Sequence, residues 1–166
     1  KDGKIIKALA QTTKMGFVFL LNRETGEPIF PVEERDVPQG AVEGDYVTKT
    51  QPFPTKPKPL TPTYLDPDDV FGFTPWDRGY CKKAAQDLRN EGLYTPPSLE
   101  GSVHYPSAIG GANWGGPAID ASRNILIANT MNLSSTIVMV PRSDCDKALK
   151  ELARDSVQSR FSALQQ

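Results

Sequence analysis

The residues best suited to chemistry gather in one glycine-rich stretch, from Ser107 to Thr130. It contains two glycine pairs, Gly110-Gly111 and Gly115-Gly116, on either side of the pair Asn113-Trp114. Glycine has no Cβ, so each glycine pair lets the backbone pass close to a flat or bulky group. The Asn113 amide offers two donors and an acceptor, and Trp114 offers a large flat face with one N–H. The pattern therefore indicates a surface that a planar group can approach.

The same stretch also predicts an ordinary β-hairpin. Residues 117–120 and 124–129 form two short apolar runs, and residues 120–123 have the composition of a turn between them. On this interpretation the glycines are only the entry to the hairpin. Trp114 then fills the core, where tryptophan is usually found. The pattern alone leaves both interpretations open.

The sequence contains no self-contained catalytic motif. There is no GxSxG, HExxH or P-loop pattern, and His104 is the only histidine, for which we expect a structural or surface role. Cys81 and Cys145 both fall in segments predicted to be helical. Without a CxxC pair or a Cys/His cluster they do not form a zinc motif. Two buried thiols and a disulfide between the helices both remain open.

The composition excludes some classes of function. The chain has 166 residues and a net charge of −1, so nothing in its charge supports binding to nucleic acid or to a membrane surface. No apolar run approaches the roughly 20 residues that a membrane-spanning helix needs. The fifteen prolines and thirteen glycines predict many turns and irregular connections. The first residue is Lys1 rather than a methionine, and we expect the chain to be part of a longer protein.

The elements that must position the glycine-rich stretch are mainly β-strands. Residues 1–30 predict a first blade-like unit, with strands at 4–10, 17–21 and 27–30 and tight turns at 14–16 and 22–26. Residues 107–141 predict a second blade-like unit that includes a strand at 136–140. Two blade-like antiparallel units with two helices indicate a mainly β fold, a partial β-propeller.

The segment 31–106 between these units is rich in proline and is predicted to be an insertion. Its proline content argues against the interior of a sheet, and residues 51–67 are either an ordered wrapping loop or a flexible excursion. One helix is predicted over 77–91, because Thr74 is a good N-cap, Pro75 suits the first helical position and Gly92 suits the end.

A last helix is predicted over 144–164, capped by Ser143. Its apolar stripe consists of Ala148, Leu149, Leu152, Ala153, Val157, Phe161 and Leu164. This stripe predicts that the helix either docks on the rest of the chain or mediates association, and docking is the expectation.

Several motifs taken together resemble the quinoprotein dehydrogenases, which use pyrroloquinoline quinone (PQQ). The first is the strand–turn–strand of residues 11–26, QTTKMGFVFLLNRETG. The others occur in the family's order, and they resemble the branch of the membrane-bound glucose and quinate/shikimate dehydrogenases. They are Val37-Pro-Gln-Gly40, Gly44-Asp-Tyr-Val-Thr48, Thr50-Gln-Pro-Phe53, Glu91-Gly92, Thr95-Pro-Pro-Ser98, Trp114-Gly-Gly116 and Ile127-Ala-Asn129. The resemblance extends over residues 8–142.

The resemblance implies a cofactor site. Lys14 matches the lysine that contacts the quinone oxygens of PQQ, where an ammonium polarises a carbonyl that must accept negative charge. Asn129 matches an asparagine of the PQQ site, and Asn113-Trp114 resembles the Asn-Trp pair that approaches PQQ in related alcohol dehydrogenases. Within this chain the resemblance implies no catalytic base and no metal ligand, although Lys14 is a candidate polarising residue.

The resemblance also implies what lies elsewhere in a longer parent chain. The family forms an eight-bladed propeller, whereas this chain accounts for about two blade-like units. The aspartate base, the ligands of the Ca²⁺ or Mg²⁺ ion and the membrane anchor are expected upstream of Lys1. We expect the fragment alone not to oxidise sugars, and turnover in a dye-linked PQQ assay would refute this.

The functional hypothesis is therefore a fragment of a PQQ-dependent oxidoreductase. The parent would act in the periplasm on a sugar or cyclic polyol, either glucose or quinate/shikimate, and would pass electrons to ubiquinone. Two alternatives stay open: a non-catalytic propeller-like binding module, and a small interaction protein that uses the C-terminal apolar stripe.

Overall fold

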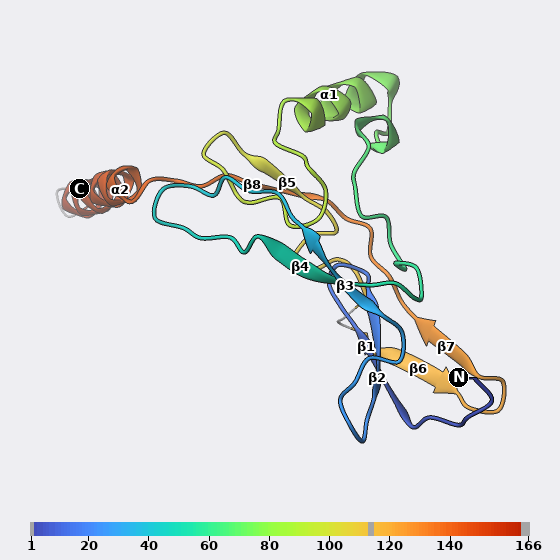
Figure 1. Cartoon of the computed structure of the whole chain (residues 1–166). Coiled ribbons are helices and arrows are strands. Elements are labelled where there is room, and N and C mark those ends of the chain that lie inside the picture. Colours follow the sequence, from blue (N-terminus) through green and yellow to red (C-terminus); the bar gives the residue numbers. More distant parts are fainter. Residues whose placement is uncertain (1, 113–114, 164–166) are drawn as a thin grey trace.

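The computed structural model describes residues 2–112 and 115–163, and its elements are mostly short antiparallel strands (Figure 1). In chain order they are β1 (Ala8–Thr12), β2 (Val18–Asn22), β3 (Val32–Asp36), β4 (Thr50–Pro54), the 3-10 helix η1 (Pro67–Asp69), α1 (Pro75–Gln86), β5 (Ser102–His104), β6 (Pro117–Asp120), β7 (Ile125–Ala128), β8 (Ser135–Ile137) and α2 (Arg142–Ala163). The strands pair as β1–β2, β3–β4, β5–β8 and β6–β7. The predicted mainly β fold with two α-helices is confirmed.

Two of the ladders are local hairpins, as the sequence predicts. β1 and β2 pair from Ala8 opposite Asn22 to Thr12 opposite Val18, so the turn between them carries Lys14 at its tip. β6 and β7 are joined by a turn that the Asp120 carboxylate organises by accepting hydrogen bonds from the backbone N–H groups of Ser122 and Arg123 (3.0 and 3.2 Å). A carboxylate that bonds to nearby backbone N–H groups in this way stabilises a tight turn.

The other two ladders join segments that are more distant in sequence, and both include strands of the proline-rich segment. Each ladder has only two strands, so none of these strands lies in the interior of a larger sheet. β3 pairs with β4 inside that segment. Pro52 and Pro54 are two residues apart in β4, so their nitrogens lie on the same edge of the ladder, where no donor is needed. The predicted strand at 136–140 is shorter, and as β8 it pairs with β5 of the proline-rich segment. The expected strand at 27–30 is reduced to one bridge between Leu21 and Pro28.

Helix α1 begins as predicted and ends earlier. The Thr74 hydroxyl accepts a hydrogen bond from the Asp77 N–H (3.2 Å), and Pro75 is the first helical residue. The predicted end at Glu91 is wrong because the chain beyond Gln86 is used elsewhere. The Arg89 N–H donates to the Gly101 oxygen (3.1 Å), and the Val103 N–H donates to the Arg89 oxygen (2.9 Å). A residue that pairs with β5 in this way cannot continue the helix.

The core lies where the β1–β2 hairpin meets β4. Phe17 and Val18 are buried, and the Phe17 ring packs edge-on against Phe53 of β4, with 5.3 Å between the ring centroids. Phe53 in turn packs against Tyr94, at 5.8 Å. Edge-to-face aromatic pairs add stability beyond the apolar area that they bury. This row of rings fixes the hairpin that carries Lys14 relative to the proline-rich segment.

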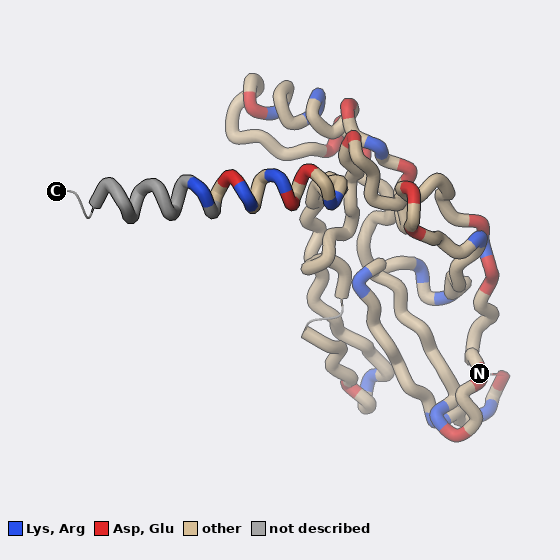
Figure 2. Tube along the Cα trace, turned by 90° about the vertical axis from the view of Figure 1, so that its left-hand side faces the viewer, with Lys and Arg blue, Asp and Glu red and all other residues tan. Residues whose placement is uncertain are grey.

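Helix α2 projects away from the rest of the chain and carries alternating charges along its described length (Figure 2). Its described side chains are exposed, including Leu149 (57%) and Leu152 (65%) of the predicted apolar stripe. The expectation that this helix docks on the rest of the chain is therefore wrong for its described part. None of the described helices has the length and apolar character needed to cross a membrane.

Candidate functional site

Lys14 lies in a turn whose backbone is held by its own hydrogen bonds. The Thr13 N–H donates to the Phe17 oxygen and the Gly16 N–H donates to the Thr13 oxygen, both at 3.0 Å. The Thr13 hydroxyl also accepts from the Phe17 N–H (3.1 Å). The Lys14 side chain is exposed at the tip of this turn. The turn thus presents an ammonium group from a backbone of fixed shape.

The glycine-rich stretch contacts this turn directly. The Ala112 N–H donates to the Thr13 oxygen at 3.1 Å, and Ala112 is buried. Gly111 has φ +71°, and a Cβ at this position would lie 2.0 Å from the Lys14 oxygen and 2.7 Å from its Cα. Any side chain at position 111 would overlap the Lys14 backbone. The predicted role of this glycine pair in close approach is therefore seen in the structure, although the group approached is the turn itself.

A short β-bridge holds the chain around Asn129 next to Gly111. Gly111 and Met131 exchange two backbone hydrogen bonds, at 3.0 and 2.9 Å. Asn129 lies two residues before Met131, and its side-chain nitrogen is 3.8 Å from the position that a Cβ would take on Gly115. Asn129 is exposed, like Lys14. Gly111 thus lies against the Lys14 backbone, and the Asn129 side chain lies near Gly115.

The other two predicted site residues, Asn113 and Trp114, lie outside the described residues. The residues next to them are described. Ala112 bonds to the Lys14 turn, and the Asn129 side-chain nitrogen lies 3.8 Å from the Cβ position of Gly115. In the sequence, the residues between Ala112 and Gly115 are the Asn-Trp pair.

The donor set at this place suits an anionic or carbonyl-bearing planar ligand. Lys14 offers an ammonium with three donors, and the Asn129 amide offers two donors and an acceptor. Among the described residues, no group of three or more His, Cys, Asp or Glu side chains is arranged to hold a metal ion.

His104 lies on β5, where burial lowers its pKa. Its Nε2 atom is buried, with no hydrogen-bond partner among the described residues.

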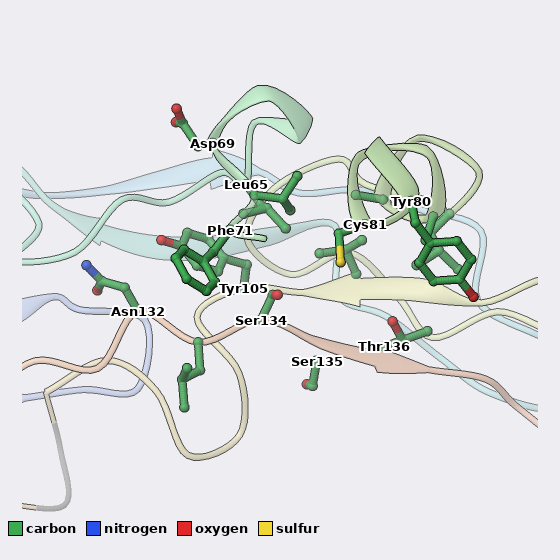
Figure 3. A pocket seen from close by; sticks show the side chains of 16 residues that line it. Leu65, Asp69, Phe71, Tyr80, Cys81, Tyr105, Asn132, Ser134, Ser135 and Thr136 are labelled. Carbon is green, nitrogen blue, oxygen red and sulfur yellow. The ribbon is translucent and has the colours of Figure 1, made fainter. Parts of the chain in front are cut away.

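A concave region lies elsewhere, between α1 and the β5–β8 ladder, with a volume of about 450 Å³. Figure 3 shows the Cys81 thiol and the Ser134 hydroxyl directed into it. Burial, and then the charge of Asp69, raise the pKa of Tyr105 in its wall. No lysine or arginine is among the described residues that line it. The described lining of this cavity therefore offers no cationic side chain to an anionic ligand, whereas the Lys14 turn does.

Sequence reasoning missed the residues that fix the Lys14 turn from outside. Leu60, in the proline-rich segment, donates its N–H to the Gly16 oxygen at 2.8 Å. Nothing in the local pattern of residues 55–61 indicates this contact, because loop residues that pack on a distant turn have no periodicity of their own. The sequence offered one hint of these contacts, namely the glycines at positions 16 and 111, because a side chain at either position would overlap the contacting segment.

Comparison with known proteins gives a consistent result. Residues 1–166 match the family described as "PQQ: Glucose/ethanol/alcohol dehydrogenase, beta-propeller domain". The chain is 41% identical over 143 residues to a quinoprotein glucose dehydrogenase of Gluconobacter oxydans, covering 86% of this chain and 18% of that protein. It is 33% identical to a probable quinate dehydrogenase (quinone) of Xanthomonas campestris pv. juglandis, covering 89% and 19%. It is 38% identical to a glycerol dehydrogenase large subunit of Gluconobacter thailandicus, covering 77% and 18%.

The chain thus spans less than a fifth of the length of these curated relatives. No solved structure matches it. The family match confirms the expected partial β-propeller, and its four two-stranded ladders form no closed ring among the described residues. The chain belongs to the β-propeller domain family of the PQQ-dependent glucose, ethanol and alcohol dehydrogenases.

Proposed function

We propose that this chain forms one wall of the PQQ site of a dehydrogenase that oxidises a sugar or polyol. One observation carries the proposal: Gly111 and Ala112 lie against the Lys14 turn, and Gly111 bonds to Met131, two residues after Asn129, although these segments are far apart in the sequence. Relatives named as quinoprotein glucose dehydrogenase and quinate dehydrogenase support the reaction class.

The residues present fit the cofactor. PQQ is a planar ortho-quinone with carboxylates, and when bound it accepts the two electrons removed from the substrate. The Lys14 ammonium, exposed on a rigid turn, would hold a quinone oxygen and stabilise its developing negative charge. The Asn129 amide would orient the edge of the ring by hydrogen bonds. Asn113 and Trp114 complete the proposed set, with Trp114 as the flat packing surface.

The remaining parts of the reaction belong to the longer protein in this proposal. The base that removes the substrate proton and the ligands of a Ca²⁺ or Mg²⁺ ion would come from other blades. The whole enzyme would be anchored in the membrane, act on the periplasmic side and deliver electrons to ubiquinone. The substrate would be glucose or a cyclic polyol such as quinate or shikimate, and the similarity to a glycerol dehydrogenase large subunit keeps smaller polyols within the class.

The test uses the full-length protein, prepared without cofactor and titrated with PQQ in the presence of Ca²⁺ or Mg²⁺. Dye reduction with a panel of sugars and polyols gives both the activity and the PQQ concentration for half-saturation. Lys14→Ala is expected to lower the maximal rate at least tenfold, and Lys14→Arg to recover only part of it, since a guanidinium is larger and planar.

Lys83→Ala is the matched control, because Lys83 is an exposed lysine on α1 that pairs with Asp87. We expect it to leave PQQ titration and rate unchanged. If Lys14→Ala behaves like Lys83→Ala, the proposed PQQ wall is wrong. If the unsubstituted full-length protein binds no PQQ at all, the non-catalytic binding module is the better description.

A further inference from the structure

The segment Thr55–Thr61 of the proline-rich region forms a strap across the Lys14 turn. At one end the strap is tied to the chain before β3, because the Thr55 N–H and hydroxyl both donate to the Pro31 oxygen (3.0 and 2.8 Å). At the other end the Leu60 N–H donates to the Gly16 oxygen at 2.8 Å. The strap therefore links a fixed point of the sheet region to the turn that carries Lys14.

Thr61 is the residue of the strap that packs most tightly on the turn. It is only 4% exposed. Gly16 has φ +76°, and a Cβ on it would lie 2.0 Å from the Thr61 hydroxyl oxygen and 3.1 Å from both the Thr61 Cβ and N atoms. The Thr61 hydroxyl is buried and makes no hydrogen bond among the described residues. Thr61 therefore acts on the turn through the volume of its side chain.

Two distant segments thus act on the same short turn. The segment 110–112 contacts the backbone of Thr13 and Lys14, and the strap contacts Gly16. A Cβ on Gly16 would overlap the strap and a Cβ on Gly111 would overlap the turn, so both segments pack closely on the turn backbone. A long lysine side chain has several rotatable bonds, so the direction of its ammonium depends first on a backbone that does not move.

We propose that Thr61 and Leu60 are positioning residues for Lys14: the strap fixes the turn so that the Lys14 ammonium is held at the cofactor. This inference rests on the proposed PQQ wall and adds to it a structural element that determines cofactor affinity. Binding groups that are misplaced by about 1 Å lose much of their effect, so a loosened strap is expected to weaken PQQ binding without removing any group that touches it.

The experiment is a double-mutant cycle in the full-length protein, read by PQQ titration of the cofactor-free enzyme. Thr61→Ala is expected to raise the half-saturating PQQ concentration about tenfold, and Thr61→Val, which restores the volume without the hydroxyl, is expected to recover most of the affinity. In a Lys14→Ala background, Thr61→Ala is expected to change the half-saturating concentration less than twofold, because the group that it positions is gone. Thr25→Ala, in the exposed turn after β2, is the matched control.

The outcomes separate this inference from the proposed function. An equal effect of Thr61→Ala with and without Lys14 would overturn the positioning role, since it indicates a general structural loss. A normal PQQ titration for Thr61→Ala, with a weakened one for Lys14→Ala, would overturn it too and leave the PQQ wall intact. If Lys14→Ala itself has no effect, the PQQ wall fails and the inference with it. Should Thr61→Ala not accumulate, Thr61→Ser is used in the same cycle with the same criteria.

Discussion

Replacing Gly111 with alanine tests the contact on which the candidate site depends. The new Cβ would lie 2.0 Å from the Lys14 oxygen and 2.4 Å from its carbonyl carbon. Carbon atoms in good contact are about 3.5–4.0 Å apart, so the two segments must separate by more than about 1 Å. A shift of that size would lengthen the 3.1 Å bond from Ala112 to Thr13 beyond hydrogen-bond range.

The size of the effect follows from the interactions that are lost. A non-glycine residue at φ +71° costs about 1 kcal/mol. The bond from Ala112 and the two bonds between Gly111 and Met131 contribute about 1 kcal/mol each, and the separation breaks some or all of them. We therefore expect Gly111→Ala to lower the free energy of unfolding by about 2–4 kcal/mol. Because the shift moves Lys14, the half-saturating PQQ concentration should rise at least tenfold.

Gly26→Ala separates the cost of backbone strain at positive φ from the cost of the steric overlap. Gly26 has φ +79°, and no atom lies within 4 Å of its Cβ position, so this variant carries the backbone strain without the overlap. It should lower stability by about 1 kcal/mol and leave PQQ titration unchanged. Denaturant unfolding and PQQ titration of both full-length variants give the comparison. Equal losses of stability for the two variants, or an unchanged PQQ affinity for Gly111→Ala, would refute the reasoning.

Two other predictions concern the core and the response to pH. Phe53→Ala should lower the free energy of unfolding by about 2–4 kcal/mol, because the ring packs edge-on against Phe17 and Tyr94. Phe53→Leu should lower it less. Denaturant midpoints of Phe53→Ala within error of the wild type would contradict this role of the ring. Burial lowers the pKa of His104 in the folded chain below its ordinary value of about 6.5. The unfolded chain therefore binds a proton at His104 more readily than the folded chain does. The contribution of neutral His104 to stability should be complete above about pH 6.5 and should be lost as the pH falls below it. Between pH 8 and pH 5 the melting temperature of His104→Gln should fall less steeply than that of the wild type. Identical slopes for the two proteins would contradict the role of His104.

The features predicted correctly from the sequence are the ones that depend on neighbouring residues. The N-terminal cap of α1 is local, because Thr74, Pro75 and Asp77 supply it between them. The β1–β2 hairpin is local in the same sense, since five residues close its turn. Each of these structures uses backbone bonds between residues a few positions apart, which is the range that propensity and capping rules describe.

The features that the sequence did not reveal depend on distant partners. The end of α1 is set by Arg89, whose backbone pairs with β5 rather than with the preceding turn of helix. The β3–β4 ladder needs Pro52 and Pro54 to lie on one edge, which only the register decides. The same holds at the candidate site: motif order selected Lys14 and Asn129 as candidates, but the position of the chain around Asn129 relative to the Lys14 turn depends on the pairing of Gly111 with Met131, which no local pattern encodes.

The exposure of Lys14 determines how much it contributes to the proposed chemistry. An ammonium 4 Å from a developing negative charge is worth about 1 kcal/mol in bulk water and about 4 kcal/mol at the effective dielectric constant of a partly covered protein site. In the described chain Lys14 and Asn129 are both exposed. The β6–β7 hairpin beside them also exposes Ile119 and Ile127, by 65% and 58%. Because apolar side chains of this kind are stabilised by burial, further blades packed here would also remove water from around Lys14 and strengthen its electrostatic effect.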